Sequence, residues 1–252
     1  MMRRGFFLCV AVCLFTITAI KAHEKGTPKV GINDVENLLL NNSKINDNAI
    51  ALSKLQLVFN NLAKKQKQYK NERDFVEYLY YFTHRKILKK YNQYASLSAT
   101  LATGLYDCLT ATAVYSILLT ELSIPHAVVE TNYHIYILVY PDSEGEILFE
   151  TTDPAYGFIT EASKIEHLKS EYKLANDEQE IGQVDISLNI ERRLQGKELI
   201  GLLFYNQSVN ELNQGNWQLA EELAKQAVKF YPNIRITKLI EYIDTSIKSA
   251  SL

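Results

Sequence analysis

Apolar side chains recur every three or four positions over two long stretches of the chain. The first runs from residue 33 to residue 95, where Phe75, Leu79 and Phe82 show the spacing clearly. The second is residues 190–252. Because this spacing places apolar side chains on one face of a helix, we expect both stretches to be α-helical.

The centre of the chain, residues 96–160, follows a different pattern. Residues 108–122 are apolar on almost every side, which is typical of a buried helix, and Pro125 ends that helix. Short apolar runs rich in β-branched residues then predict strands, separated by turn residues, at 127–129, 135–140 and 147–151. A helix followed by a small antiparallel sheet predicts an α+β fold. Residues 161–189 are more polar and read as a connecting segment.

The first 22 residues resemble a secretory signal peptide. Arg3 and Arg4 precede an apolar run from Phe6 to Ile20, and Ala22 stands before a polar stretch. We therefore expect cleavage after Ala22 and an exported protein, periplasmic or extracellular. An uncleaved membrane anchor is the alternative, although the run is shorter than the ~20 residues that a spanning helix needs. No other long apolar stretch occurs, so we expect no stable membrane span after cleavage.

Signal cleavage would leave one thiol in the mature protein. Cys9 and Cys13 lie within the predicted signal peptide, so Cys108 would be the single remaining cysteine. A lone thiol in an oxidising compartment is a liability unless it is buried or has a use. A buried structural cysteine is the alternative interpretation.

Charge and composition exclude several function classes. The chain carries 27 Lys and Arg against 29 Asp and Glu, a net charge of −2, and it has no basic stripe of the kind that nucleic acids require. The sequence shows neither a glycine-rich phosphate loop nor a metal-ligand cluster. We therefore expect no cofactor, no metal and no nucleic-acid partner.

Cys108 stands at the start of the predicted apolar helix, directly after Asp107. The positive end of a helix dipole lowers the pKa of a thiol, and the free N–H groups of the first turn can stabilise an oxyanion. This position predicts a nucleophile held as a thiolate.

His134 and Asp153 are the expected partners of Cys108. His134 precedes the strand at 135–140, and Asp153 follows the strand at 147–151. If these strands form a hairpin, both side chains lie at the same end of the sheet. Asp153 would then orient the imidazole of His134, which would take the proton of Cys108.

Three short stretches carry a resemblance to a known superfamily: Tyr106-Asp107-Cys108 before a helix rich in small residues, Tyr133-His134-Ile135-Tyr136, and Glu150-Thr151-Thr152-Asp153. Together they resemble the core of the transglutaminase-like superfamily, in its small secreted bacterial form. The resemblance covers residues 96–160, about a quarter of the chain. It implies a papain-like core with Cys108 as nucleophile, His134 as base and Asp153 as orienting acid.

The resemblance implies acyl transfer or hydrolysis at an amide of a protein or peptide substrate, as in a protease, an amidase or a cross-linking enzyme. Some members place a tryptophan upstream of the nucleophile, whereas Trp217 is the only tryptophan here and lies far downstream. Gln93, Tyr94 and Tyr106 are possible substitutes. A catalytically inactive binding or scaffold protein on the same fold is therefore the alternative.

The C-terminal helices resemble one tetratricopeptide repeat plus a capping helix. The stretch from Leu203 to Pro232 carries Gly215, Trp217 and small alanines at suitable spacings. The alanines would let two helices approach closely. Such a segment either binds a protein partner or caps the core.

Overall fold

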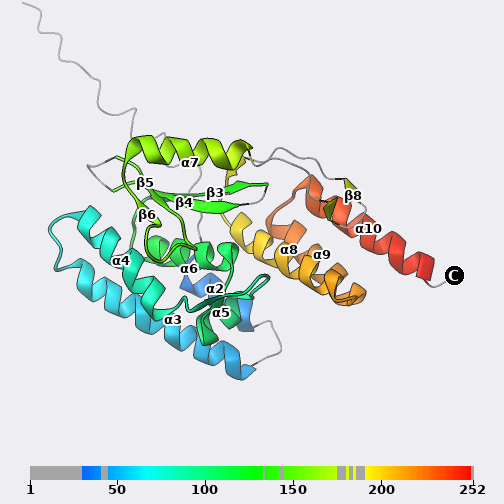
Figure 1. Ribbon diagram of the computed structural model, residues 1–252. Helices are drawn as coiled ribbons and strands as arrows, with labels where there is room; N and C mark the ends of the chain where they lie inside the picture. Colours follow the sequence, from blue (N-terminus) through cyan, green and yellow to red (C-terminus); the bar gives the residue numbers. More distant parts are fainter. Residues whose placement is uncertain are drawn as a thin grey trace, which may run out of the picture.

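The computed structural model describes residues 30–40, 45–132, 134–141, 145–174, 180–181, 184–185 and 191–250. The predicted signal peptide at residues 1–22 lies outside these ranges, as do Tyr133 and parts of the predicted connecting segment. Within them the fold is mixed, with helices around a five-stranded antiparallel sheet (Figure 1). This agrees with the expected α+β class.

The sheet has the strand order β6-β5-β4-β3-β9. The predicted hairpin is confirmed, because β4 pairs with β5 in antiparallel register, with Ile137 opposite Phe149. The strands are β3 (His126–Thr131), β4 (Ile135–Val139), β5 (Ile147–Phe149), β6 (Phe158–Ile159) and β9 (Glu191–Arg193).

Helices cover both faces of this sheet. Ile135 and Ile137 of β4 join the main core with α6 (Cys108–Glu121), whereas Tyr136 and Leu138 join a second cluster with α7 (Ala162–Leu174). Figure 1 shows α7 and α6 on opposite sides of the sheet. Since both faces are buried, β4 is apolar at every position instead of alternating.

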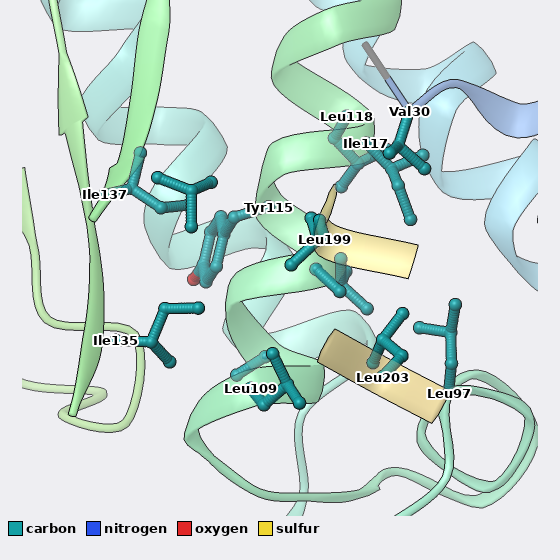
Figure 2. Close-up of a cluster of buried hydrophobic side chains, with 14 of the residues drawn as sticks. Val30, Leu97, Leu109, Tyr115, Ile117, Leu118, Ile135, Ile137, Leu199 and Leu203 are labelled. Carbon is teal, nitrogen blue, oxygen red and sulfur yellow. The ribbon is translucent and has the colours of Figure 1, made fainter. Parts of the chain in front are cut away.

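Helix α6 is the centre of the molecule, which explains why its sequence has almost no polar face. Figure 2 shows side chains of α6 between Ile135 and Ile137 of β4 on one side and Leu199 and Leu203 of α8 on the other. All of its positions from Leu109 to Leu119 are buried. The sheet therefore holds one side of the helix and the C-terminal segment holds another.

The N-terminal segment is helical, as expected, up to Lys86. Its helices are α2 (Ile32–Leu40), α3 (Ile45–Gln66) and α4 (Glu72–Lys86). The expectation that this helical stretch continues to residue 95 is wrong, because Lys90–Tyr91 forms strand β1, parallel to β2 (Leu105–Tyr106). The backbone N–H groups of Lys89 and Lys90 donate to Gly104 O at 2.9 and 3.2 Å, so a contact distant in sequence ends the helical stretch. Helix α5 (Leu97–Thr103) lies between the two strands in sequence.

The C-terminal segment contains helices α8 (Glu198–Asn213), α9 (Trp217–Phe230) and α10 (Ile234–Ala250). The small alanines are fully buried in the α8–α9 interface, as predicted: Ala220, Ala224 and Ala227. The expectation that helix begins at residue 190 is wrong, because Glu191–Arg193 is strand β9. This strand pairs with the open edge of β3 and satisfies backbone groups that would otherwise stay unpaired.

A buried ion pair fastens the C-terminal helices to the sheet. Glu130 of β3 is 3% exposed, and it accepts from Tyr231 Oη at 2.6 Å and from Arg235 Nη2 of α10. The guanidinium of Arg235 also lies over the ring of Tyr205, 4.6 Å from its centroid. None of the helices in the described part of the chain has both the length and the apolar character that a bilayer crossing requires.

His126 is buried in the core as a neutral imidazole. The side chain is 2% exposed, with Nδ1 3.0 Å from Ile124 O and Nε2 2.9 Å from Ser116 Oγ. Because a carbonyl oxygen only accepts, Nδ1 carries the proton and Nε2 accepts from the hydroxyl. Burial lowers the pKa of His126 from 6.5 to about 4.

We expect His126 to make the protein less stable in acid. Between these two pKa values the unfolded chain binds a proton that the folded chain does not, so stability is present above pH 6.5 and falls towards pH 4. The free energy of unfolding should drop by about 2–3 kcal/mol from pH 7 to pH 4 through this residue. Urea unfolding at both pH values measures the drop. It should shrink in His126→Gln and persist in His167→Gln, and an equal drop in the His126 variant would contradict the assignment.

Candidate active site

Cys108 is the first residue of α6, as the sequence predicts. Its position is fixed by a capping box: Asp107 Oδ1 accepts from Thr110 N at 2.8 Å, and Asp107 N donates to Thr110 Oγ1 at 3.0 Å. Such a box satisfies N–H groups that would otherwise be unpaired at the helix start. The thiol is therefore held at a rigid helix terminus, and Cys108 itself is half-buried.

The electrostatics of Cys108 differ from the expectation. Burial, with smaller contributions from the charges of Asp107 and Glu150, raises the pKa of the thiol to about 12. The N–H groups of Leu109 and of Cys108 itself act in the opposite direction but do not outweigh burial. The structure therefore does not support the predicted thiolate, because burial of the thiol, and to a lesser extent the carboxyl group of Asp107, outweigh the helix dipole. At neutral pH Cys108 is a thiol.

His134 stands directly before β4 in the turn that follows β3. Thr131 bonds to both backbone polar groups of His134. His134 N donates to Thr131 Oγ1 at 3.0 Å, and Thr131 N donates to His134 O at 2.8 Å. The backbone of His134 is therefore fixed at the end of the sheet, and about a fifth of the side chain is exposed.

Glu150, the residue after β5, is the carboxylate that contacts His134. Nε2 of His134 lies 2.6 Å from Glu150 Oε2, and Thr152 Oγ1 donates to Glu150 Oε1 at 2.7 Å. Tyr172 Oη donates to Glu150 Oε2 at 2.8 Å. Burial pushes the pKa of Glu150 up, but the hydrogen bonds from His134, Thr152 and Tyr172 hold it below its usual value. Glu150 is therefore ionised at neutral pH.

The expected pairing of Asp153 with His134 is replaced by this contact. Asp153 Oδ1 accepts from the backbone N–H groups of Ala155 and Tyr156, each at 2.9 Å. The carboxylate of Asp153 therefore caps the turn that leads to β6. An aspartate followed by a proline, as in Asp153-Pro154, suits this role, because aspartate stabilises turns of this kind.

Thr151 links the His134–Glu150 pair to Cys108. Its hydroxyl lies 3.0 Å from Thr112 Oγ1 and donates to Cys108 O at 3.4 Å, both on α6. Glu150 and Thr151 are consecutive, so Glu150 contacts the imidazole of His134 while Thr151 contacts α6. Across the described ranges, no hydrogen bond joins the Cys108 sulfur directly to His134. Cys108 is thus connected to the His134–Glu150 pair through Thr151, the residue after Glu150.

Helix α4 holds the loop from its other side. Tyr80 Oη donates to Glu150 O at 2.7 Å and to Asp153 O at 2.5 Å, and its ring stacks on Tyr115 of α6 with centroids 5.3 Å apart. Gly157 closes the loop, because Glu150 N donates to Gly157 O at 2.8 Å. The position of the Glu150 backbone is thus set by α4 and α6 together.

Two further side chains near Cys108, those of Asn206 and Tyr91, were not predicted from the sequence. Asn206 of α8 donates to Asp107 Oδ2 at 3.0 Å, which joins the C-terminal helices to the cap of the nucleophile helix. Burial raises the pKa of Tyr91, with smaller contributions from the charges of Cys108 and Asp107. Tyr91 lies near the thiol because β1 pairs with β2, placing Tyr91 opposite Tyr106, two residues before Cys108.

Comparisons with known proteins add no further evidence on the site. Neither the family models, nor the curated proteins, nor the solved structures gave a match to this chain. In the described ranges, no group of three or more His, Cys, Asp or Glu side chains is placed to hold a metal ion.

Proposed function

We propose that the protein is a thiol acyl-transfer enzyme of the transglutaminase-like class, acting on an amide of a protein or peptide. The observation that carries the proposal is the contact of His134 Nε2 with the ionised Glu150, whose neighbour Thr151 donates to the carbonyl oxygen of Cys108 at the start of α6. A histidine oriented by a carboxylate beside a cysteine at a helix terminus is the arrangement that nucleophilic catalysis requires. Glu150 takes the orienting role that we expected for Asp153.

The roles follow from the two nitrogens of the imidazole. Because Glu150 holds Nε2, Nδ1 is the nitrogen that would accept the proton of Cys108. The sulfur attacks the amide carbonyl as His134 takes its proton, and His134 returns that proton to the leaving amine. The thioester then reacts with water, giving hydrolysis, or with an amine, giving cross-linking. Since Cys108 is a thiol at neutral pH, its deprotonation accompanies the attack.

We expect 4-nitrophenyl acetate to acetylate Cys108 at neutral pH. The release of nitrophenolate should show a burst of about one equivalent per protein, followed by slower turnover, because a covalent intermediate accumulates. Stopped-flow absorbance measures the burst, and peptide mass mapping locates the acetyl group. Cys108→Ala should lose the burst. Equal release by wild type and Cys108→Ala would overturn the proposal.

A non-catalytic binding protein is the second candidate, favoured by the raised pKa of the Cys108 thiol. A groove of about 540 Å³ between α2, α8 and α9 offers a surface for a protein partner, with Leu38, Phe204, Leu223 and Phe230 along its walls. The same acylation experiment separates the two candidates. A folded wild-type protein that forms no thioester at Cys108 would favour the binding role.

A further inference from the structure

Helix α7 covers the sheet face opposite α6 and delivers one polar group to the candidate site. Ile165 of α7 is buried in the second hydrophobic cluster against Tyr136, Leu138 and Leu148 of the sheet. Tyr172, in the last turn of α7, packs against the same cluster. This packing fixes Tyr172 beside the His134–Glu150 pair.

Tyr172 contacts both members of that pair with different parts of its side chain. Its hydroxyl donates to Glu150 Oε2 at 2.8 Å, the same oxygen that lies 2.6 Å from His134 Nε2. Its ring lies against the imidazole, with centroids 4.5 Å apart. Tyr136 packs against both rings, with its centroid 5.3 Å from that of Tyr172 and 6.5 Å from that of His134.

We propose that Tyr172 is a positioning residue for the acyl-transfer site, which fixes the Glu150 carboxylate through its hydroxyl and the His134 ring through its aromatic face. The effect of Tyr172 on catalysis rests on the proposed function, whereas its contacts with Glu150 and His134 do not. A carboxylate with two donors on one oxygen has little freedom to rotate, so its hydrogen bond to the imidazole keeps one geometry. Tyr172 touches neither the thiol nor the reacting carbonyl, so it acts through Glu150 and His134.

The two contacts can be separated by substitution. Tyr172→Phe keeps the ring against His134 and removes the donor to Glu150, whereas Tyr172→Leu removes both. We expect acylation of Cys108 by 4-nitrophenyl acetate to slow about tenfold in Tyr172→Phe, the effect of losing one hydrogen bond to a charged group, and to slow further in Tyr172→Leu. Tyr136→Phe is the matched control, because it removes a hydroxyl from the same aromatic cluster that does not bond to Glu150.

The decisive readout is the titration of the Glu150 carboxyl group, which needs no substrate. In protein labelled with ¹³C at glutamate side-chain carboxyls, the Glu150 signal is assigned from its loss in Glu150→Gln. We expect its pKa to move upward in Tyr172→Phe, because a donor that stabilises the carboxylate is gone, and to stay at the wild-type value in Tyr136→Phe. The acid limb of the acylation rate should move in the same direction.

The outcomes distinguish this inference from the proposed function. An unchanged Glu150 titration in Tyr172→Phe overturns the inference even if the wild type is acylated normally. An upward shift without acylation of the wild type supports the positioning by Tyr172 and removes the proposed enzymatic role.

Discussion

Replacing Glu150 by glutamine is expected to slow the acylation of Cys108 by about 10²–10⁴-fold, the range that a properly oriented general base contributes. Glutamine occupies nearly the same volume but carries no negative charge, so it cannot stabilise the imidazolium that forms when His134 accepts a proton. Its amide can also turn an N–H group toward Nε2 and thereby favour the wrong tautomer. The burst rate with 4-nitrophenyl acetate measures the loss.

Asp153→Asn provides the matched control for this experiment. The side-chain oxygen of asparagine can still accept from Ala155 N and Tyr156 N, so the turn after β5 should be kept. We expect its acylation rate to stay within about threefold of the wild type, since surface changes away from a site cost little. A large loss in Asp153→Asn with a near-normal rate in Glu150→Gln would return the orienting role to Asp153.

Gly157→Ala is expected to lower the free energy of unfolding by about 3–5 kcal/mol. A Cβ atom at Gly157 would lie 2.0 Å from Tyr80 Oη, 2.1 Å from Glu150 O and 2.6 Å from Asp153 O. Two of these atoms are backbone and the third is held by hydrogen bonds to them, so no flexible side chain can move aside. Urea unfolding monitored by circular dichroism measures the loss.

The control for the glycine substitution is Gly215→Ala, at the turn between α8 and α9. Gly215 has φ of +80° but open space around its Cβ position, so only backbone strain opposes the alanine. That strain costs about 1–2 kcal/mol. If both variants lose the same amount of stability, the close approach at Gly157 does not hold the loop as described.

Local apolar patterns in the sequence were sufficient to predict the elements whose side chains form the core. The apolar run at residues 108–122 predicted α6 to within one residue at its C-terminal end, and the turn near Gly145 predicted the β4–β5 hairpin. Strand β9 could not be predicted in this way. Its sequence, Glu191-Arg192-Arg193, has no apolar periodicity, and it is a strand only because the edge of β3 lies beside it.

The orienting acid could have been found from strand register. Ile137 lies opposite Phe149, and continuing this register places Tyr136 opposite Glu150. Side chains alternate along a strand, so His134, Tyr136 and Glu150 fall on one face, whereas Asp153 lies beyond the turn that follows β5. The raised pKa of the Cys108 thiol could not be predicted from the sequence, because it depends on burial by elements that are distant in the chain.

His134 and Glu150 are expected to act on Cys108 as one unit, and a double-mutant cycle on the acylation rate measures this coupling. The burst rate is measured for wild type, His134→Ala, Glu150→Gln and the double variant. Because the orienting role of Glu150 requires His134, we expect the double variant to be about as slow as His134→Ala alone. Losses that multiply, so that the double variant is slower by the product of the two single effects, would contradict it.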